Sequence, residues 1–184
     1  MNKSAVVLIT SIWEAYCEDL AAEALGHIVK HSKTASSLSK EIKKLVAKEL
    51  KSDTNQLAIW DLSDDGWRQV LQARLARLQK NRNRRLNTPK FANIDELFLT
   101  AIGITEISKS WRWTNMTASQ ARTKLDKYVT LRGEIAHRGT ASRSCSKQQV
   151  DDYFAFIKRV VGKTGGRVNT HVKKATGKPL WKDA

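Results

Sequence analysis

Apolar residues recur every three or four positions along most of the chain, which is the spacing of one face of an amphipathic α-helix. The first such stripe covers about residues 5–30 and runs through Val6, Ile9, Trp13, Tyr16, Leu20, Ala24 and Ile28. Two further stripes predict helices over residues 36–51 and 63–80. No segment alternates apolar and polar residues convincingly, so we predict no β-strand.

Capping signals place the ends of several helices. Ser63 is a suitable N-cap for the third helix, and the sequence 93–96 (Asn-Ile-Asp-Glu) resembles the entry to a fourth. Gly103 is well placed to end that fourth helix in the left-handed conformation. The sequences 117–120 (Thr-Ala-Ser-Gln) and 146–149 (Ser-Lys-Gln-Gln) are capping boxes, so we expect each to open a helix.

The helical stripes predict an all-α protein, most simply an antiparallel helical bundle of five to seven helices. We expect residues 1–162 to form a single helical domain, which is long enough to bury a core without disulfides or metals. From Gly162 onward the sequence is basic and interrupted by glycines. Residues 163–184 are therefore expected to form a basic, loosely ordered C-terminal tail.

The charge balance points to a polyanionic partner. Thirty-three basic residues against eighteen acidic ones give a net charge of +15, which favours binding to nucleic acid. No apolar run is long enough to span a membrane, so we expect no membrane partner. Cys17 and Cys145 are the two cysteines, and the start of the chain has no signal-peptide cleavage site. A reducing, cytoplasmic location is the simplest expectation.

Other motifs give weaker signals. His27 and His31 have a spacing that can share a zinc ion, but no acidic partner completes the site, so we predict neither a metal nor a cofactor. Trp111 and Trp113 can stack on bases, although tryptophans at a bundle corner are more often part of the core. The basic stretch 80–85 fits either a phosphate-binding loop or a solvated one.

Arg132 and His137 stand near the end of a predicted helix that closes at Gly139. A guanidinium can hold a phosphate while an imidazole moves a proton beside it. Five residues correspond to about 140° around an α-helix, so the two side chains do not converge on one face. They can meet only if the helix ends or bulges, which Gly133 makes easier, or if two copies face each other across a two-fold axis.

The sequence Arg132-Gly-Glu-Ile-Ala-His137 resembles the signature of HEPN domains, an arginine and a histidine separated by four to six residues. Residues 12–20, 93–98, 102–104 and 111–113 are similar to the RiboL-PSP-HEPN branch and the related MAE_28990-like branch. The resemblance covers most of the chain, from about Val6 to Val161. It implies an all-α bundle that forms a homodimer with the motif near the interface.

For active members, the resemblance also implies a metal-independent endoribonuclease, common in toxin–antitoxin and antiphage systems. Arg132 would then stabilise the charge on the scissile phosphate, and His137 would act as general base or acid. The 2′-hydroxyl is the nucleophile in this chemistry, so the substrate is RNA and the product ends are a 2′,3′-cyclic phosphate and a 5′-hydroxyl. A toxin of this kind would have an antitoxin or another defence-complex partner.

The chain departs from the family pattern at Gly133, where members often carry a polar residue after the arginine. Glu134 and Glu14 are the two candidates to supply the missing polar contact. The expected phosphate contacts are Arg138, Arg82, Arg84 and Arg85. The departure keeps a second hypothesis open, in which the chain is a non-catalytic RNA-binding or regulatory HEPN module of a defence complex.

Overall fold

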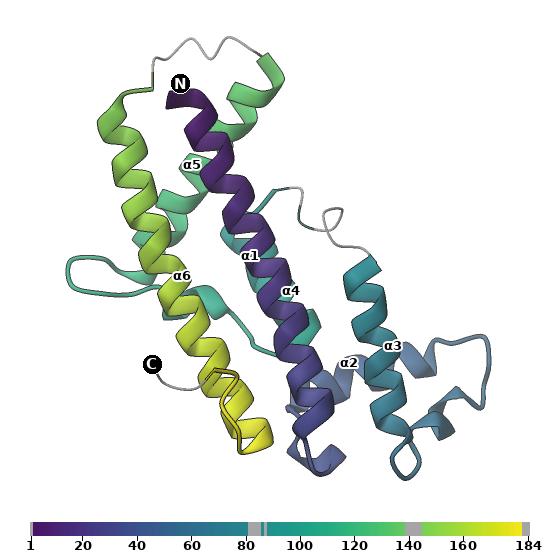
Figure 1. The fold of residues 1–184 in the computed structure, drawn as a ribbon. Helices are drawn as coiled ribbons and strands as arrows, with labels where there is room; N and C mark the ends of the chain where they lie inside the picture. The colour runs from purple at the N-terminus through teal and green to yellow at the C-terminus, as the bar shows by residue number, and fades with distance from the viewer. Residues whose placement is uncertain (1, 81–85, 87, 139–144, 182–184) are drawn as a thin grey trace.

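A computed structural model describes residues 2–80, 86, 88–138 and 145–181, with backbone only at residues 137 and 138. The described residues form six α-helices and three short 3₁₀ helices without a β-strand, which confirms the predicted all-α bundle (Figure 1). In chain order they are α1 (Asn2–His31), η1 (Ala35–Ser37), α2 (Lys40–Lys51), η2 (Ala58–Leu62), α3 (Gly66–Lys80), α4 (Phe91–Ile102), η3 (Ile107–Ser110), α5 (Ala118–Arg138) and α6 (Lys147–Thr176).

Helix α1 lies at the centre of the bundle and packs against α3, α4, α5 and α6. Its buried residues include Trp13 and Cys17, which have no solvent exposure. Helices α1 and α6 run side by side in the same direction (Figure 1). Asn2 Nδ2 donates to Cys145 O at the start of the pair, and the Tyr16 hydroxyl donates to Val161 O further along. The bundle is therefore not antiparallel throughout.

Three predicted helix caps are confirmed, one at the C-terminal end of α4 and one each at the N-terminal ends of α5 and α6. Gly103 adopts φ +73° after α4, and a Cβ there would lie 2.2 Å from Ser39 Oγ, so only glycine fits. Thr117 Oγ1 accepts from Gln120 N while Gln120 Oε1 accepts from Thr117 N. Ser146 and Gln149 form the same reciprocal pair at the start of α6.

Two predicted helix starts are displaced by a few residues. Helix α3 begins at Gly66 because Ser63 closes the preceding turn η2, with its N–H donating to Trp60 O. Helix α4 begins at Phe91, so Asn93 lies inside the first turn and donates its side-chain N–H to Thr88 O. At the start of α3 the backbone N–H of Gly66 donates to Ser63 O, and at the start of α4 the backbone N–H of Phe91 donates to Asp126 Oδ1 on α5, so neither start needs the expected cap.

The prediction that the last helix ends near Gly162 is wrong, because α6 continues to Thr176. Thr164, Val168 and Val172 on this second half are completely buried. The glycines that predicted a break are accommodated inside the helix, since burial against α1 outweighs their low helix propensity. Residues 163–176 are thus helical, in place of the expected loose tail.

A polar network fixes the corner between α4 and α5. Asp95 accepts from the backbone N–H of Ser108 at 2.8 Å and from its hydroxyl at 2.7 Å. Arg122 Nε donates to the same hydroxyl at 2.7 Å. Trp111 next to it is completely buried, as expected of a core tryptophan, and its indole N–H donates to Thr164 Oγ1 at 2.9 Å. This corner therefore ties α4, α5 and α6 together.

None of the helices in the described ranges combines the length and the apolarity that a membrane span requires.

Candidate active site

Helix α5 carries the Arg132–His137 pair. Its buried face, through Ala121, Leu125 and Val129, packs on the core and fixes its rotation. The helix continues without interruption through both residues of the pair, so the backbone neither ends nor bulges at Gly133. The two residues are therefore about 140° apart around one regular helix. Within a single chain they do not share a face.

Arg132 lies on the side of α5 that faces α1. Its side chain is half-buried, and its Nε is enclosed without a hydrogen-bond partner among the described residues. Glu14 on α1 is the acidic neighbour that interacts electrostatically with this guanidinium. Burial raises the pKa of Glu14, the positive charge of Arg132 lowers it, and the nearby Glu18 raises it. A half-buried carboxyl thus accompanies an arginine that keeps an unused donor.

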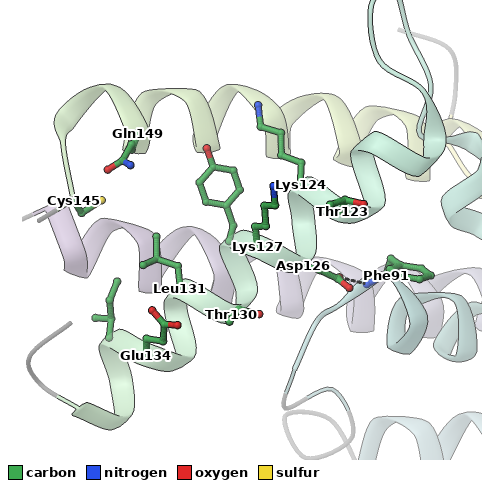
Figure 2. A pocket seen from close by; sticks show the side chains of 12 residues that line it. Phe91, Thr123, Lys124, Asp126, Lys127, Thr130, Leu131, Glu134, Cys145 and Gln149 are labelled. Carbon is green, nitrogen blue, oxygen red and sulfur yellow. Dashed lines mark hydrogen bonds between the residues drawn. The ribbon is translucent and has the colours of Figure 1, made fainter. Parts of the chain in front are cut away.

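Glu134, the other acidic candidate, lies on a different side of the helix. It is exposed and lines a groove between α5 and the start of α6, together with Leu131, Cys145 and Gln149 (Figure 2). Two residues correspond to about 200° around a helix, so Arg132 and Glu134 point in opposite directions. The structure therefore brings Glu14 into the neighbourhood of Arg132 and does not bring Glu134 there.

This groove has a volume of about 870 Å³, which is within the usual range for ligand-binding clefts. Lys124 and Lys127 line it, and Figure 2 shows both on the same stretch of α5. Sequence reasoning did not single out these two lysines. Their signal was present, however, because Lys124, Lys127, Glu134 and Arg138 recur at helical spacing and form one polar stripe.

His137 and Arg138 are the last two residues of α5, and only their backbone is described. The remaining predicted phosphate contacts, Arg82, Arg84 and Arg85, lie outside the described residues.

The histidine pair on α1 has a spacing that can share a metal ion. The rings of His27 and His31 lie close together, with centroids 4.4 Å apart. Among the described residues, no group of three or more His, Cys, Asp and Glu side chains is arranged to hold a metal ion. The pair therefore has no third protein ligand in this part of the chain.

Comparison with protein families identifies the family of the chain. The family model described as RiboL-PSP-HEPN matches residues 1–167, which include α1, the Arg132–His137 motif and most of α6. The chain belongs to the RiboL-PSP-HEPN family. The resemblance seen in the sequence is thereby confirmed, and it places the chain in the HEPN class, which commonly includes ribonucleases. No curated protein and no solved structure gives a significant match to this RiboL-PSP-HEPN chain.

Proposed function

We propose that this RiboL-PSP-HEPN chain is a metal-independent endoribonuclease that cuts RNA as a homodimer. The observation that carries the proposal is the position of Arg132, which is half-buried beside the acidic Glu14 where α1 packs against α5. A guanidinium held in a fixed place is suited to a phosphate oxygen, because guanidinium–phosphate hydrogen bonds are charge-assisted and directional. The family match over residues 1–167 supports the same assignment.

In the proposed reaction, Arg132 binds a non-bridging oxygen of the scissile phosphate and stabilises the charge that builds there. One His137 removes the proton from the 2′-hydroxyl, and the 2′-oxygen forms a bond to phosphorus. The bond from phosphorus to the 5′-oxygen breaks, and a second His137 donates a proton to that leaving oxygen. The products are a 2′,3′-cyclic phosphate and a 5′-hydroxyl. DNA has no 2′-hydroxyl and is not a substrate.

The dimer is part of the proposal because of the regular helix. In one chain, α5 separates the positions of Arg132 and His137 by about 140°, so the two residues stand on different faces of the helix. A two-fold axis beside the end of α5 would bring Arg132 of one copy towards His137 of the other. Such a groove contains two histidines, which allows one to act as the base and the other as the acid.

Glu14 is proposed as the residue that positions Arg132. Its carboxyl is the acidic neighbour of the guanidinium, and both groups are half-buried between α1 and α5. We expect Glu14→Gln to lower kcat/KM by on the order of tenfold or more, since a small displacement of a positioned group is costly in rate. The charge of Arg132 is retained in this variant, so the salt dependence of RNA binding should not change. A defect in Glu134→Gln with a normal Glu14→Gln would contradict the assignment.

The RNA backbone is proposed to follow the lysine stripe of α5. Lys124 and Lys127 line the groove, and Arg138 continues the stripe at helical spacing. Each lysine that neutralises one phosphate should add about one unit to the slope of log affinity against log salt. Lys127→Ala is therefore expected to weaken binding of all RNA sequences alike and to reduce that slope by about one.

A second candidate function is favoured by Gly133. A Cβ added at this position would meet no other atom within 4 Å, so the fold has room for the polar side chain that family members often carry there. Without that side chain, the domain could bind RNA, or regulate a defence complex, without cutting. This alternative predicts salt-sensitive RNA binding and no cleavage products. Gly133→Asn would restore cutting if the missing polar group is the reason.

The proposal is tested by incubating end-labelled single-stranded RNA with the protein in the presence of EDTA. Wild-type protein is expected to cut and to leave 2′,3′-cyclic phosphate ends, whereas Arg132→Ala and His137→Ala should not. Arg132→Lys keeps the charge but loses the planar donor fork, so it should retain RNA binding and lose most of the activity. Cutting that survives both alanine substitutions, or that EDTA abolishes, would overturn the proposal.

We also propose that the enzyme acts in the cytoplasm as a toxin or an antiphage effector. In that role, its expression in a bacterium should arrest growth, and His137→Ala should remove the arrest. An antitoxin or another complex member would then be required to restrain it.

A further inference from the structure

Exposed apolar side chains are concentrated in the turn between α2 and α3. Seven large apolar side chains are exposed among the described residues, and three of them fall within residues 57–60. Leu57 is 67% exposed, Ile59 37% and Trp60 70%. An exposed tryptophan beside two exposed aliphatic residues is typical of a protein-binding surface, because tryptophan is among the residues that contribute most to interface energy.

The same segment has a charge opposite to that of the protein. Residues 52–65 contain four aspartates and no lysine or arginine, although the whole chain has a net charge of +15. The four aspartates, Asp53, Asp61, Asp64 and Asp65, are all exposed. Among the described residues, Asp65 alone of the four forms an ion pair, with Arg68 at 3.4 Å. We call this surface, made by Leu57, Ile59, Trp60 and the four aspartates, the acidic apolar turn.

The acidic apolar turn is held in place by the rest of the fold. Ala58 is buried, and Leu62 packs against the core, so the turn is anchored from below. Successive backbone bonds close it, with Trp60 N donating to Leu57 O at 2.9 Å and Gly66 N donating to Ser63 O at 2.8 Å. A Cβ at Gly66 would lie 2.2 Å from Asp61 O, so the close approach of the two backbones requires glycine. The exposed tryptophan is therefore presented by a defined backbone.

An apolar pocket of about 290 Å³ adjoins the turn. Leu62 from η2 lines it together with Ile42 and Val46 from α2 and Trp67 from α3. A pocket of this size next to the turn can receive an apolar side chain from a partner, in the way that interface anchors fill pockets.

We propose that the acidic apolar turn is a docking surface for a separate protein that presents a basic, apolar segment. RNA is disfavoured here, because the unpaired carboxylates repel phosphates. A symmetric contact with a second copy is also disfavoured, since it would bring two sets of four aspartates together. A segment that combines lysine or arginine with leucine or phenylalanine complements both the charge and the apolar side chains. This inference is independent of the proposed RNA cleavage.

The test uses the full chain and a synthetic amphipathic peptide of leucine, lysine and alanine, labelled for fluorescence anisotropy. A matched peptide with glutamate in place of lysine is the charge control. The lysine peptide is expected to bind and the glutamate peptide not to bind. Binding should weaken between about 0.1 M and about 1 M salt, because screening shortens the range of the carboxylate attraction.

Variants of the turn locate the binding surface. Trp60→Ser combined with Leu57→Ser should raise the dissociation constant at least about tenfold, as expected for an interface anchor. Asp61→Asn combined with Asp64→Asn should weaken binding and reduce its salt dependence. Phe154→Ser on α6 is the matched control, since Phe154 is 55% exposed but lies outside the turn, and it should bind as wild type does. All the substituted side chains are exposed, and circular dichroism checks that each variant folds.

Several results would overturn the inference. One is failure of the lysine peptide to bind the wild-type chain, and another is equal binding by the Trp60→Ser, Leu57→Ser variant. RNA that crosslinks at Trp60 would assign the turn to nucleic acid instead. A concentration-dependent dimer that dissociates in the Trp60→Ser, Leu57→Ser variant would assign it to a second copy of the chain.

Discussion

Replacement of Thr164 by valine tests how much a buried hydrogen bond in the second half of α6 contributes to the stability of the fold. The Thr164 hydroxyl accepts the indole N–H of Trp111 at 2.9 Å and donates to Val160 O at 2.8 Å. Thr164 and Trp111 have no solvent exposure. Valine has nearly the same shape as threonine, so Thr164→Val removes the hydroxyl with little change in packing.

The cost of this change follows from the buried N–H that it leaves without an acceptor. An unsatisfied buried donor costs about 1–3 kcal/mol, and water cannot reach this one. For a chain of this length, 1 kcal/mol corresponds to a shift of about 2–4 °C in Tm. We therefore expect Thr164→Val to lose about 2 kcal/mol and about 4–8 °C.

Thr170→Val is the matched control on the same helix. The Thr170 hydroxyl also donates to the carbonyl four residues earlier, Gly166 O, at 2.9 Å, but its side chain is exposed. Its replacement should change the free energy of unfolding by no more than about 0.5 kcal/mol, as is usual at the surface. The assay is urea unfolding followed by circular dichroism, with thermal melting alongside. Equal losses in the two variants would refute the reasoning, since burial of the hydrogen bond would then carry no extra cost.

Two further predictions concern α6. Gly166→Ala should raise the free energy of unfolding by about 0.5–1 kcal/mol, because a Cβ there meets nothing within 4 Å and alanine favours the helix. Gly165→Ala should not raise it, because a Cβ at that position would lie 2.9 Å from Tyr16 Oη. Urea unfolding of the two variants measures the difference, and equal stabilisation would contradict the packing. Burial lowers the pKa of His171 below its usual value of 6.5, against a hydrogen bond to Ile102 O that raises it. The unfolded chain therefore takes up this proton at a higher pH than the folded chain does, so the free energy of unfolding falls as the pH drops below about 6.5. His171→Gln should reduce this loss, which is measured by comparing the free energy of unfolding at about pH 7.5 and at about pH 5.5. An unchanged acid loss in the variant would exclude His171 as its source.

Much of the fold could be predicted from local signals. The capping boxes at Thr117 and Ser146 and the left-handed glycine at Gly103 act within one turn of helix, so the sequence around each is sufficient to identify it. The separation of Arg132 and His137 is also local, because it follows from the number of residues per turn once the helix is known to be regular.

The second half of α6 could not be predicted in this way. Gly162, Gly165 and Gly166 lower the local helix propensity, and the sequence therefore favoured a break. The helix stays intact because it contacts residues distant in the sequence, such as Tyr16. The Tyr16 hydroxyl would lie 2.9 Å from a Cβ added at Gly165, so the two helices approach closely there. A propensity argument has no access to such contacts, because they depend on α1 and α6 lying side by side.

Glu14 was predicted as a neighbour of Arg132 only as one of two options, the other being Glu134. Helical rotation turns Glu134 to the groove on another side of α5. Glu14 is near enough to Arg132 for the two charges to interact because α1 packs against α5, and such packing is not readable from local sequence. The lysine stripe through Lys124 and Lys127 was visible in the sequence as a spacing, but its meaning depends on the groove that it lines.

The measurement that tests the central claim most directly is cleavage by mixed dimers. Wild-type and His137→Ala chains, each with a different affinity tag, are combined, and the mixed dimers are purified by both tags. Because the proposed reaction uses one histidine as the base and the other as the acid, a mixed dimer lacks one of the two groups. The mixed dimers should therefore be nearly as inactive in EDTA as the His137→Ala dimer. Mixed dimers that keep about half of the wild-type cleavage, or a wild-type chain that cuts RNA as a strict monomer, would contradict the account.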